Sequence, residues 1–321
     1  MVWGGGSAAR VRERHAEGAR VVAWTGTDPA ELTRAGIPVE SIEMVIGDEG
    51  RDAAVAAART WARLWGRLPL VDGNSFRDLV AWREMSLLWL AEGFLRHQTA
   101  GPRCAELAET ALRLLDATRA QEADGLGLSG PEATLLSRAC TARGVLYHGP
   151  APGGRPLRVP APGRKSALAR VHDVFAPRVP PASPGSGAGE AGGQGPVLLV
   201  PGSGRDPEAY RPLLQGLGAV PGPEVVVVPA PDLTRWETRD VRRRAAKAEA
   251  RLKERRELLR GAPGLHESYA HGGVGFGDLA SGDLDALLLG HLPAAVRRLE
   301  AAVELLSATR PALAIVAGAE R

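Results

Sequence analysis

Apolar residues recur at strand and helix periods along most of the first 149 residues. Short apolar runs alternate with longer stretches in which apolar residues return every three or four positions. The expected strands are 20–24, 41–47, 124–130 and 145–149, and the expected helices are 8–18, 51–65, 76–97, 102–118 and 131–144. Because strands and helices alternate across short turns, we expect an α/β domain with a parallel, doubly wound, Rossmann-like sheet.

Turn residues stand where this alternation needs them. Gly26 suits the tight loop after the first expected strand, Thr27 or Asp28 suits the N-cap, and Pro29 suits the first helical position. A second turn precedes Ser75, a suitable cap for the helix that follows. These signals support the predicted element boundaries.

A change in composition divides the chain. Residues 150–195 are too rich in proline, glycine and other small residues to form a core, which predicts a flexible linker. We therefore expect two α/β units, 1–149 and 196–321. In the second, strands are expected at 196–200, 225–229 and 312–317, with a basic helix over 234–260 and a terminal helix from 293.

The two units share a sequence echo. Aligned without gaps, 105–119 and 296–310 have seven residues in common and end in the same Ala-Thr-Arg. Either two alanine- and leucine-rich helices resemble each other by chance, or the units are related Rossmann-like halves. The first copy continues into a helix and a strand after position 130, so we expect the second unit to be truncated and the chain to be a fragment.

Composition limits the classes of function. A net charge of +3 neither requires nor excludes an anionic partner. The N-terminus lacks the apolar core of a signal peptide, and the longest apolar run is too short to span a membrane. We expect a cytoplasmic bacterial protein whose Cys104 and Cys140 are buried, reduced thiols. No metal-ligand spacing occurs and no cofactor is implied.

Candidate phosphate chemistry lies after the first strand of the second unit. There Gly202, Ser203 and Gly204 precede an expected helix, so their backbone N–H groups could bind phosphate. An ordinary strand-to-helix turn is the simpler alternative, because the third glycine of the dinucleotide fingerprint is missing. A hydrolase is a third possibility, but the chain has no G-x-S-x-G elbow.

Candidate acid–base groups concentrate in the loop that contains His271 and Asp278. A loop histidine can deprotonate a sugar hydroxyl, although solvated polar side chains are the simpler interpretation. The basic helix over Arg242–Arg256 is either a solvated face or a peripheral contact with anionic lipid at the inner face of the membrane. It lacks interleaved aromatic residues, so we expect no nucleic-acid partner.

The order of these features resembles a known group of enzymes. A basic helix, the loop GGVGFGDLASGDL, a helix ending LLSATRP, and a buried strand followed by Glu320 resemble the N-terminal half of GT-B-type glycosyltransferases and glycerophosphotransferase-like proteins of bacterial surface-polysaccharide biosynthesis. The resemblance covers about 196–321, and more loosely SFRDLVAWREMSLLWLAEGFL. It implies that Gly202–Gly204, His271, Asp278 and Glu320 face a cleft on the acceptor side.

The resemblance also implies the partners. A nucleotide-activated sugar or polyol-phosphate donor would bind a further Rossmann domain after this chain, and the acceptor would be a cell-surface glycan. The rival hypothesis is a non-catalytic α/β binding or scaffold module, and an α/β-hydrolase-like enzyme is the third.

Overall fold

The computed structural model describes residues 1–5, 8–25, 27–150, 197–200, 225–227, 233 and 236–316. The chain divides into two compact units. One comprises Met1–Gly163 and Leu252–Leu292, and the other Arg164–Arg251 and Pro293–Arg321. The expected boundary assigned all of 196–321 to the second unit, whereas the division assigns Leu252–Leu292 to the first. The expected linker lies outside the described residues from position 151 onward.

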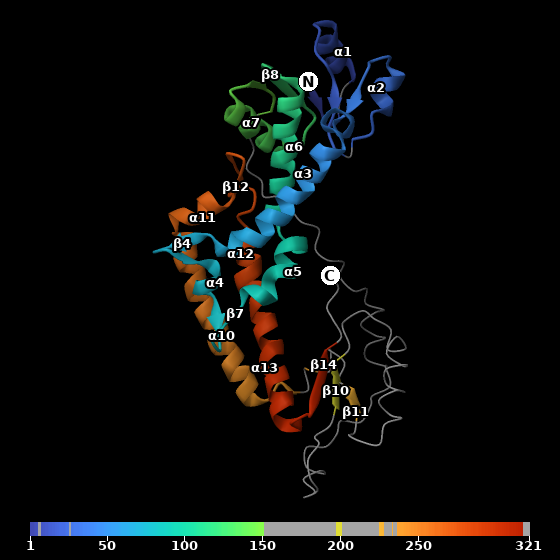
Figure 1. Cartoon of the computed structure of the whole chain (residues 1–321). Helices are drawn as coiled ribbons and strands as arrows, with labels where there is room; N and C mark the ends of the chain where they lie inside the picture. The colour runs from blue at the N-terminus through green and yellow to red at the C-terminus, as the bar shows by residue number, and fades with distance from the viewer. Residues whose placement is uncertain are drawn as a thin grey trace, which may run out of the picture. The chain divides into compact units, whose positions relative to one another are not determined.

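The first unit is built on a five-stranded parallel sheet of order β3-β2-β1-β8-β9 (Figure 1). Its strands are β1 (Val2–Trp3), β2 (Val22–Ala23), β3 (Glu40–Ser41), β8 (Glu122–Leu126) and β9 (Leu146–His148). The order runs outward from β1 in both directions, first to β2 and β3 and then to β8 and β9. This is the doubly wound, Rossmann-like order, and the predicted α/β class is confirmed.

Two short helices pack against strands β1 and β2 and form a hydrophobic core with them. Helices α1 (Ala8–Ala16) and α2 (Ala30–Arg34) supply Val11 and Leu32, which pack with Trp3 and Ala23 in one buried cluster. At the start of α2 the Asp28 carboxylate accepts a hydrogen bond from Ala30 N at 3.0 Å. The helix nevertheless begins one residue later than predicted, because Pro29 is the N-cap residue and not the first helical position; Gly26 lies outside the described residues.

Three longer helices come after β3 in the chain, and the last of them also follows β8. They are α3 (Ile42–Leu64), extended by the 3-10 turn η1 (Trp65–Arg67), then α6 (Ala100–Thr118) and α7 (Gly130–Arg143). Helices α3 and α6 lie along each other (Figure 1). A capping box at Ser129 and Glu132 starts α7, and left-handed Gly144 ends it. The boundaries of α6 and α7 lie close to the predicted ones, whereas α3 begins nine residues earlier than the predicted start at 51.

The predicted strand over 41–47 is present only at its first residue, because β3 ends at Ser41 and the following residues are helical. Ser41 is also the N-cap of α3, and its hydroxyl accepts a hydrogen bond from Met44 N at 3.3 Å. The backbone of Gly47 (φ 70°) interrupts the helical conformation and produces a kink within α3. The apolar run that suggested a strand therefore belongs to the first turns of a helix.

The predicted helix over 76–97 is interrupted, because one hairpin separates two short helices in this region and another hairpin precedes them. The elements from η1 onward are β4 (Pro69–Val71), β5 (Asn74–Ser75), α4 (Phe76–Leu79), β6 (Ala81–Trp82), β7 (Met85–Ser86) and α5 (Leu88–Gln98). Arg83 (φ 49°) and Glu84 (φ 64°) form the left-handed turn between β6 and β7. That turn interrupts the helix that the apolar spacing predicted.

Residues 252–292 complete an aromatic core in the first unit. Trp61 and Trp65 of α3 and η1 contact Tyr269, with ring centroids 5.4 and 5.6 Å apart, and Phe276 lies 5.9 Å from Trp61. Trp61 also donates a hydrogen bond to Ser268 O at 3.0 Å. The elements of this segment are α11 (Pro263–Ser268), β12 (Ala270–His271), β13 (Val274–Gly275), α12 (Asp283–Asp285) and a π-helical turn (Ala286–His291).

The second unit contains a three-stranded parallel sheet of order β11-β10-β14. The strands are β10 (Val197–Val200), β11 (Val225–Val227) and β14 (Leu313–Val316), which confirms the three predicted strands. Helix α10 (Arg239–Arg260) begins in this unit and continues into the first at Leu252, and α13 (Leu292–Thr309) belongs to this unit from Pro293. Glu300 of α13 is fully buried and accepts a hydrogen bond from Arg244 of α10 at 2.5 Å.

The sequence echo has a counterpart in backbone structure. Thr118 of α6 and Thr309 of α13 each donate a hydrogen bond to the carbonyl four residues earlier. The next residues, Arg119 (φ 48°) and Arg310 (φ 43°), are both left-handed, and each is followed by a parallel strand that begins three residues later. Moreover, β11-β10-β14 reproduces the central order β2-β1-β8. These matches support the interpretation of two related halves.

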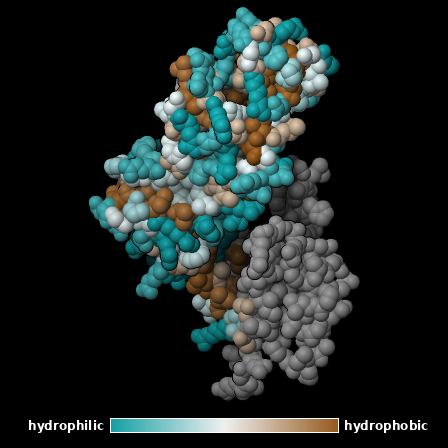
Figure 2. Space-filling model, turned by 45° about the horizontal axis from the view of Figure 1, so that its top comes forward, coloured by the Kyte–Doolittle hydropathy of each residue, from teal (hydrophilic) through white to brown (hydrophobic). Residues whose placement is uncertain are grey.

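The surface of the described residues is mixed. Polar side chains cover much of the face seen in Figure 2, and apolar side chains gather there in separate patches. Among the helices of the described part of the chain, none combines the length and apolar character needed to cross a membrane.

Candidate functional site

His271 lies at the end of a tight hairpin in the first unit. Strands β12 and β13 are antiparallel, with His271 opposite Val274. Between them Gly272 (φ 56°) and Gly273 (φ 83°) are both left-handed, as a type I′ hairpin turn requires. A Cβ added to Gly272 would lie 2.5 Å from Cδ1 of Leu112 on α6. The glycine pair therefore allows the hairpin to approach α6 closely.

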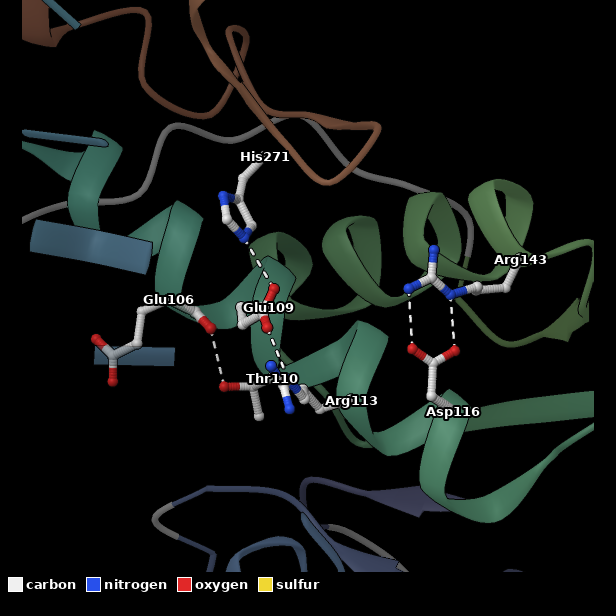
Figure 3. Close-up of polar contacts among 7 residues, drawn as sticks. All are labelled: Glu106, Glu109, Thr110, Arg113, Asp116, Arg143 and His271. Carbon is white, nitrogen blue, oxygen red and sulfur yellow. Dashed lines mark hydrogen bonds and ion pairs between the residues drawn. The ribbon is translucent and has the colours of Figure 1, made fainter. Parts of the chain in front are cut away.

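On α6 the histidine meets a carboxylate. His271 Nε2 lies 2.8 Å from Glu109 Oε2, and Arg113 Nε donates to Glu109 Oε1 at 2.7 Å (Figure 3). When Nε2 donates to the carboxylate, Nδ1 of the neutral ring keeps its lone pair and can accept a proton. Figure 3 shows Nδ1 directed away from Glu109. The arrangement is that of a histidine base oriented by a carboxylate.

The charge on Glu109 is stabilised by its partners. Burial alone raises the pKa of this carboxyl, but hydrogen bonds from Arg113 and His271 outweigh burial and hold its pKa below the ordinary value. Glu109 therefore stays ionised near neutral pH and can stabilise a positive charge on His271. This is the property that a general base needs in its supporting carboxylate.

A hollow of about 350 Å³ adjoins this group. Glu109 and Arg113 line it together with Asp116 and Arg143, which form a bidentate pair at 2.7 and 2.9 Å (Figure 3). The hydrogen bond from Arg143 lowers the pKa of Asp116. Two arginines beside an oriented histidine can accommodate an anionic or hydroxyl-bearing ligand once their present partners are displaced.

Asp278 belongs to a different contact. Its carboxylate pairs with Arg138 of α7 at 2.7 and 2.9 Å, and the same guanidinium donates to Gly275 O at 2.7 Å. The hydrogen bond from Arg138 lowers the pKa of Asp278. His271 and Asp278 thus bind separate helices, and the role of Asp278 shown by these contacts is to fix β13 and the following turn against α7.

The other predicted site residues cannot be placed. The described residues stop at Val200 and at Val316, so they do not include Gly202, Ser203, Gly204 or Glu320. The three predicted residues 202–204 follow β10 in the sequence, and Glu320 follows β14. These two strands are neighbours in the sheet.

A glycine-rich loop in the first unit was missed by sequence reasoning. The run from Gly4 to Ala9 reads GGGSAA and follows the G-x-G-x-x-A form of the dinucleotide fingerprint. It stands between β1 and α1, the context in which that fingerprint binds a pyrophosphate. The available signal was the apolar pair Val2–Trp3 before the glycines, which is too short to identify a strand by periodicity.

Two loops meet at the carboxyl ends of β1 and β8. A Cβ added to Gly127, whose φ is 69°, would lie 1.8 Å from Gly5 O, and one added to Gly4 would lie 2.7 Å from Leu128 Cδ2. Only glycine permits these approaches. The strand order reverses between β1 and β8, and ligands of open α/β sheets bind at such a reversal, outside the carboxyl ends of the strands.

A larger hollow, about 380 Å³, lies at the opposite, amino edge of the sheet. Its charged groups are already paired: Arg14 binds Asp124 at 3.1 Å, and Arg20 binds Glu40 at 2.6 Å. Because ligands of this fold bind at the carboxyl edge, we regard the glycine loop as the better candidate for a nucleotide site. The His271 group is a candidate because of its acid–base geometry.

Thiols and metal ligands add no further site. Cys104 and Cys140 are free and buried as predicted, and burial raises their pKa values to about 12 and about 11. Both are therefore protonated and unreactive at neutral pH. Within the described ranges, no group of three or more His, Cys, Asp or Glu side chains is arranged to bind a metal.

Comparison with known proteins adds no relative. The chain matches no protein-family model, no curated protein and no solved structure.

Proposed function

We propose that the first unit binds a nucleotide-activated donor at the carboxyl edge of its sheet, and that the chain acts as a glycosyltransferase-like enzyme on a surface-glycan acceptor. The observation that carries the proposal is the reversal of strand order at β1, directly before the G-x-G-x-x-A loop. Backbone N–H groups of such a loop and the N-terminus of the next helix suit a diphosphate. The resemblance alone would assign the donor to a further domain.

His271 is the proposed base for the acceptor hydroxyl. Its support is the 2.8 Å contact with ionised Glu109, which orients the ring and stabilises the imidazolium that forms when a proton is taken up. Arg113 and Arg143 are the proposed contacts for the anionic or hydroxyl groups of the acceptor. Asp278, by contrast, is proposed to act through the position of the hairpin and not on the substrate.

Peripheral contact with an anionic membrane through the Arg242–Arg256 helix is a separate proposal. Arg244 and Arg256 are engaged by Glu300 and Asp285, so contact would rest on exposed Arg242, Lys247 and Arg255. Glutamine at those three positions is expected to abolish salt-sensitive binding to phosphatidylglycerol vesicles. Binding that persists unchanged in the triple variant contradicts this contact.

Calorimetric titration of the full chain with nucleotide-diphosphate sugars tests donor binding. Ala9→Glu places a negative charge at the N-terminus of α1, where it favours the helix but repels a diphosphate, so we expect at least tenfold weaker binding. Ala16→Glu, an exposed change at the other end of α1, is the matched control and is expected to leave binding unchanged. Absence of binding, or equal binding by both variants, contradicts the proposal.

The transfer step has its own test. His271→Gln is expected to lower the transfer rate about 100-fold, the usual contribution of a general base, while nucleotide binding is unchanged. Saturable nucleotide binding without any sugar transfer would support the non-catalytic binding module instead.

A further inference from the structure

The exposed face of α3 carries charges in a self-complementary order. Asp48 and Asp52 stand in one half of the helix after its kink, and Arg59 and Arg63 stand in the other. All four are exposed, and at 3.6 residues per turn they fall within about 60° of the helix circumference. Val55, 42% exposed, lies between the two halves on the same face.

The arrangement is symmetric about the point between Val55 and Ala56. Asp52 and Arg59 lie equally far from this point along the helix, and so do Asp48 and Arg63. An identical helix placed antiparallel, with a twofold axis at this point, would therefore set each aspartate opposite an arginine. Twofold symmetry doubles each contact, so four ion pairs would form.

The side chains needed for these contacts are available. Asp52, Arg59 and Arg63 form no ion pair with any residue in the described part of the chain, and Asp48 pairs only with neighbouring Arg51 there. The same face borders a hollow of about 450 Å³, lined by α3 from Asp52 to Arg63 and by Arg96 of α5. The face is thus charged, open and recessed.

We propose that a second copy of this chain docks antiparallel on α3, with Asp48 opposite Arg63 and Asp52 opposite Arg59 of the partner. Val55 and Ala56 would meet the same residues of the second copy at the axis. The charged stretch spans about 22 Å at 1.5 Å per residue, so the interface is small and belongs to the weak, transient class. Its affinity is accordingly expected to decrease as salt concentration rises.

Sedimentation velocity of the full chain over a range of concentrations tests the proposal. At low ionic strength we expect a reversible dimer. We expect it to dissociate in about 0.5 M salt, where the Debye length has fallen to a few ångströms. Asp52→Arg and Arg59→Asp each place like charges opposite one another twice, so each variant is expected to dimerise at least tenfold more weakly.

Mixing the two variants provides the decisive comparison. In a heterodimer of Asp52→Arg with Arg59→Asp, every facing pair again has opposite charges, so association is expected to return to the original strength. The double variant in one chain restores the same pairs and is expected to dimerise with itself. Circular dichroism of each variant checks that the helices are intact.

A chain that stays monomeric at low salt overturns the proposal. So does a dimer unaffected by the single substitutions, since it would use another face. Failure of the mixed variants to associate, with all helices intact, also overturns it, because restoring opposite charges at the facing positions would then not restore association.

Discussion

Asp283 is a buried carboxylate that caps a helix from 182 residues away in sequence. Its two oxygens accept hydrogen bonds from Ala100 N and Gly101 N, both at 2.8 Å, at the start of α6. The preceding residue, Thr99, makes no cap with its own side chain. Burial nevertheless raises the pKa of Asp283 to about 6, because the cost of desolvating the charge exceeds the gain from the two N–H donors.

This pKa predicts a particular dependence of stability on pH. The folded-state pKa lies above the unfolded value of about 3.9, so the contribution of Asp283 is fully present below pH 4 and is lost as pH rises through 6. The free energy of unfolding of wild type relative to Asp283→Asn should therefore decrease by about 2–3 kcal/mol between pH 4 and pH 7. Urea unfolding of both proteins at several pH values measures this difference in the free energy of unfolding. A difference that stays constant with pH contradicts the prediction.

Gly101 provides a second test at the scale of one residue. A Cβ at this position would lie 2.0 Å from Cη2 of Trp61, so Gly101→Ala must displace the indole at the centre of the aromatic core. We expect a loss of about 1–3 kcal/mol in the free energy of unfolding. The helical Gly93 has open space around it, and Gly93→Ala is the control, expected to add up to about 1 kcal/mol. Equal effects of the two substitutions contradict this account.

At the scale of elements, two hairpins differ in how well their turn residues suit them. The β4–β5 turn uses Asp72 (φ 48°) and Gly73 (φ 80°), a favourable pair, whereas the β6–β7 turn places Arg83 and Glu84 in the same left-handed conformation. Glu84→Gly should raise the free energy of unfolding by about 0.5–1 kcal/mol, and Gly73→Ala should lower it by about 1 kcal/mol. Thermal unfolding of both variants measures these changes. A Glu84→Gly variant that is no more stable than the original chain contradicts the first expectation.

The same elements show which parts of the fold could be predicted from the sequence. Helices with a clear apolar period, such as α6 and α7, were predicted within about two residues. The β6–β7 hairpin was not, because Arg83 and Glu84 have no turn preference and the surrounding apolar spacing fits a helix. Likewise β1 has two residues, too few for any period to show. Its position follows only from pairing with β2 and β8.

The candidate site was predictable to a similar extent. His271 could be singled out because it is a titratable residue beside two glycines. Its partner Glu109 lies 162 positions away on the polar side of an ordinary amphipathic helix, and no local pattern connects them. Asp278 was a comparable guess, and its pairing with Arg138 likewise depends on packing of the hairpin between α6 and α7.

At the scale of the whole molecule, the division into two compact units leads us to expect that they unfold separately. Arg244→Met removes the guanidinium that binds buried Glu300 and should destabilise the second unit by about 2 kcal/mol or more. Gly101→Ala should affect only the first unit. Differential scanning calorimetry is expected to show two transitions, each lowered by one substitution. A single transition shifted by both variants contradicts the independence of the units.

The division of the first unit into two chain segments has a consequence for synthesis on the ribosome. Trp61 and Trp65 are made early, whereas Tyr269 and Phe276, which cover them, come about 200 residues later. At an elongation rate of about 20 residues per second, this interval is about 10 s. During it the nascent first segment lacks the residues that cover Trp61 and Trp65, so we expect it to expose apolar surface until the last quarter of the polypeptide emerges.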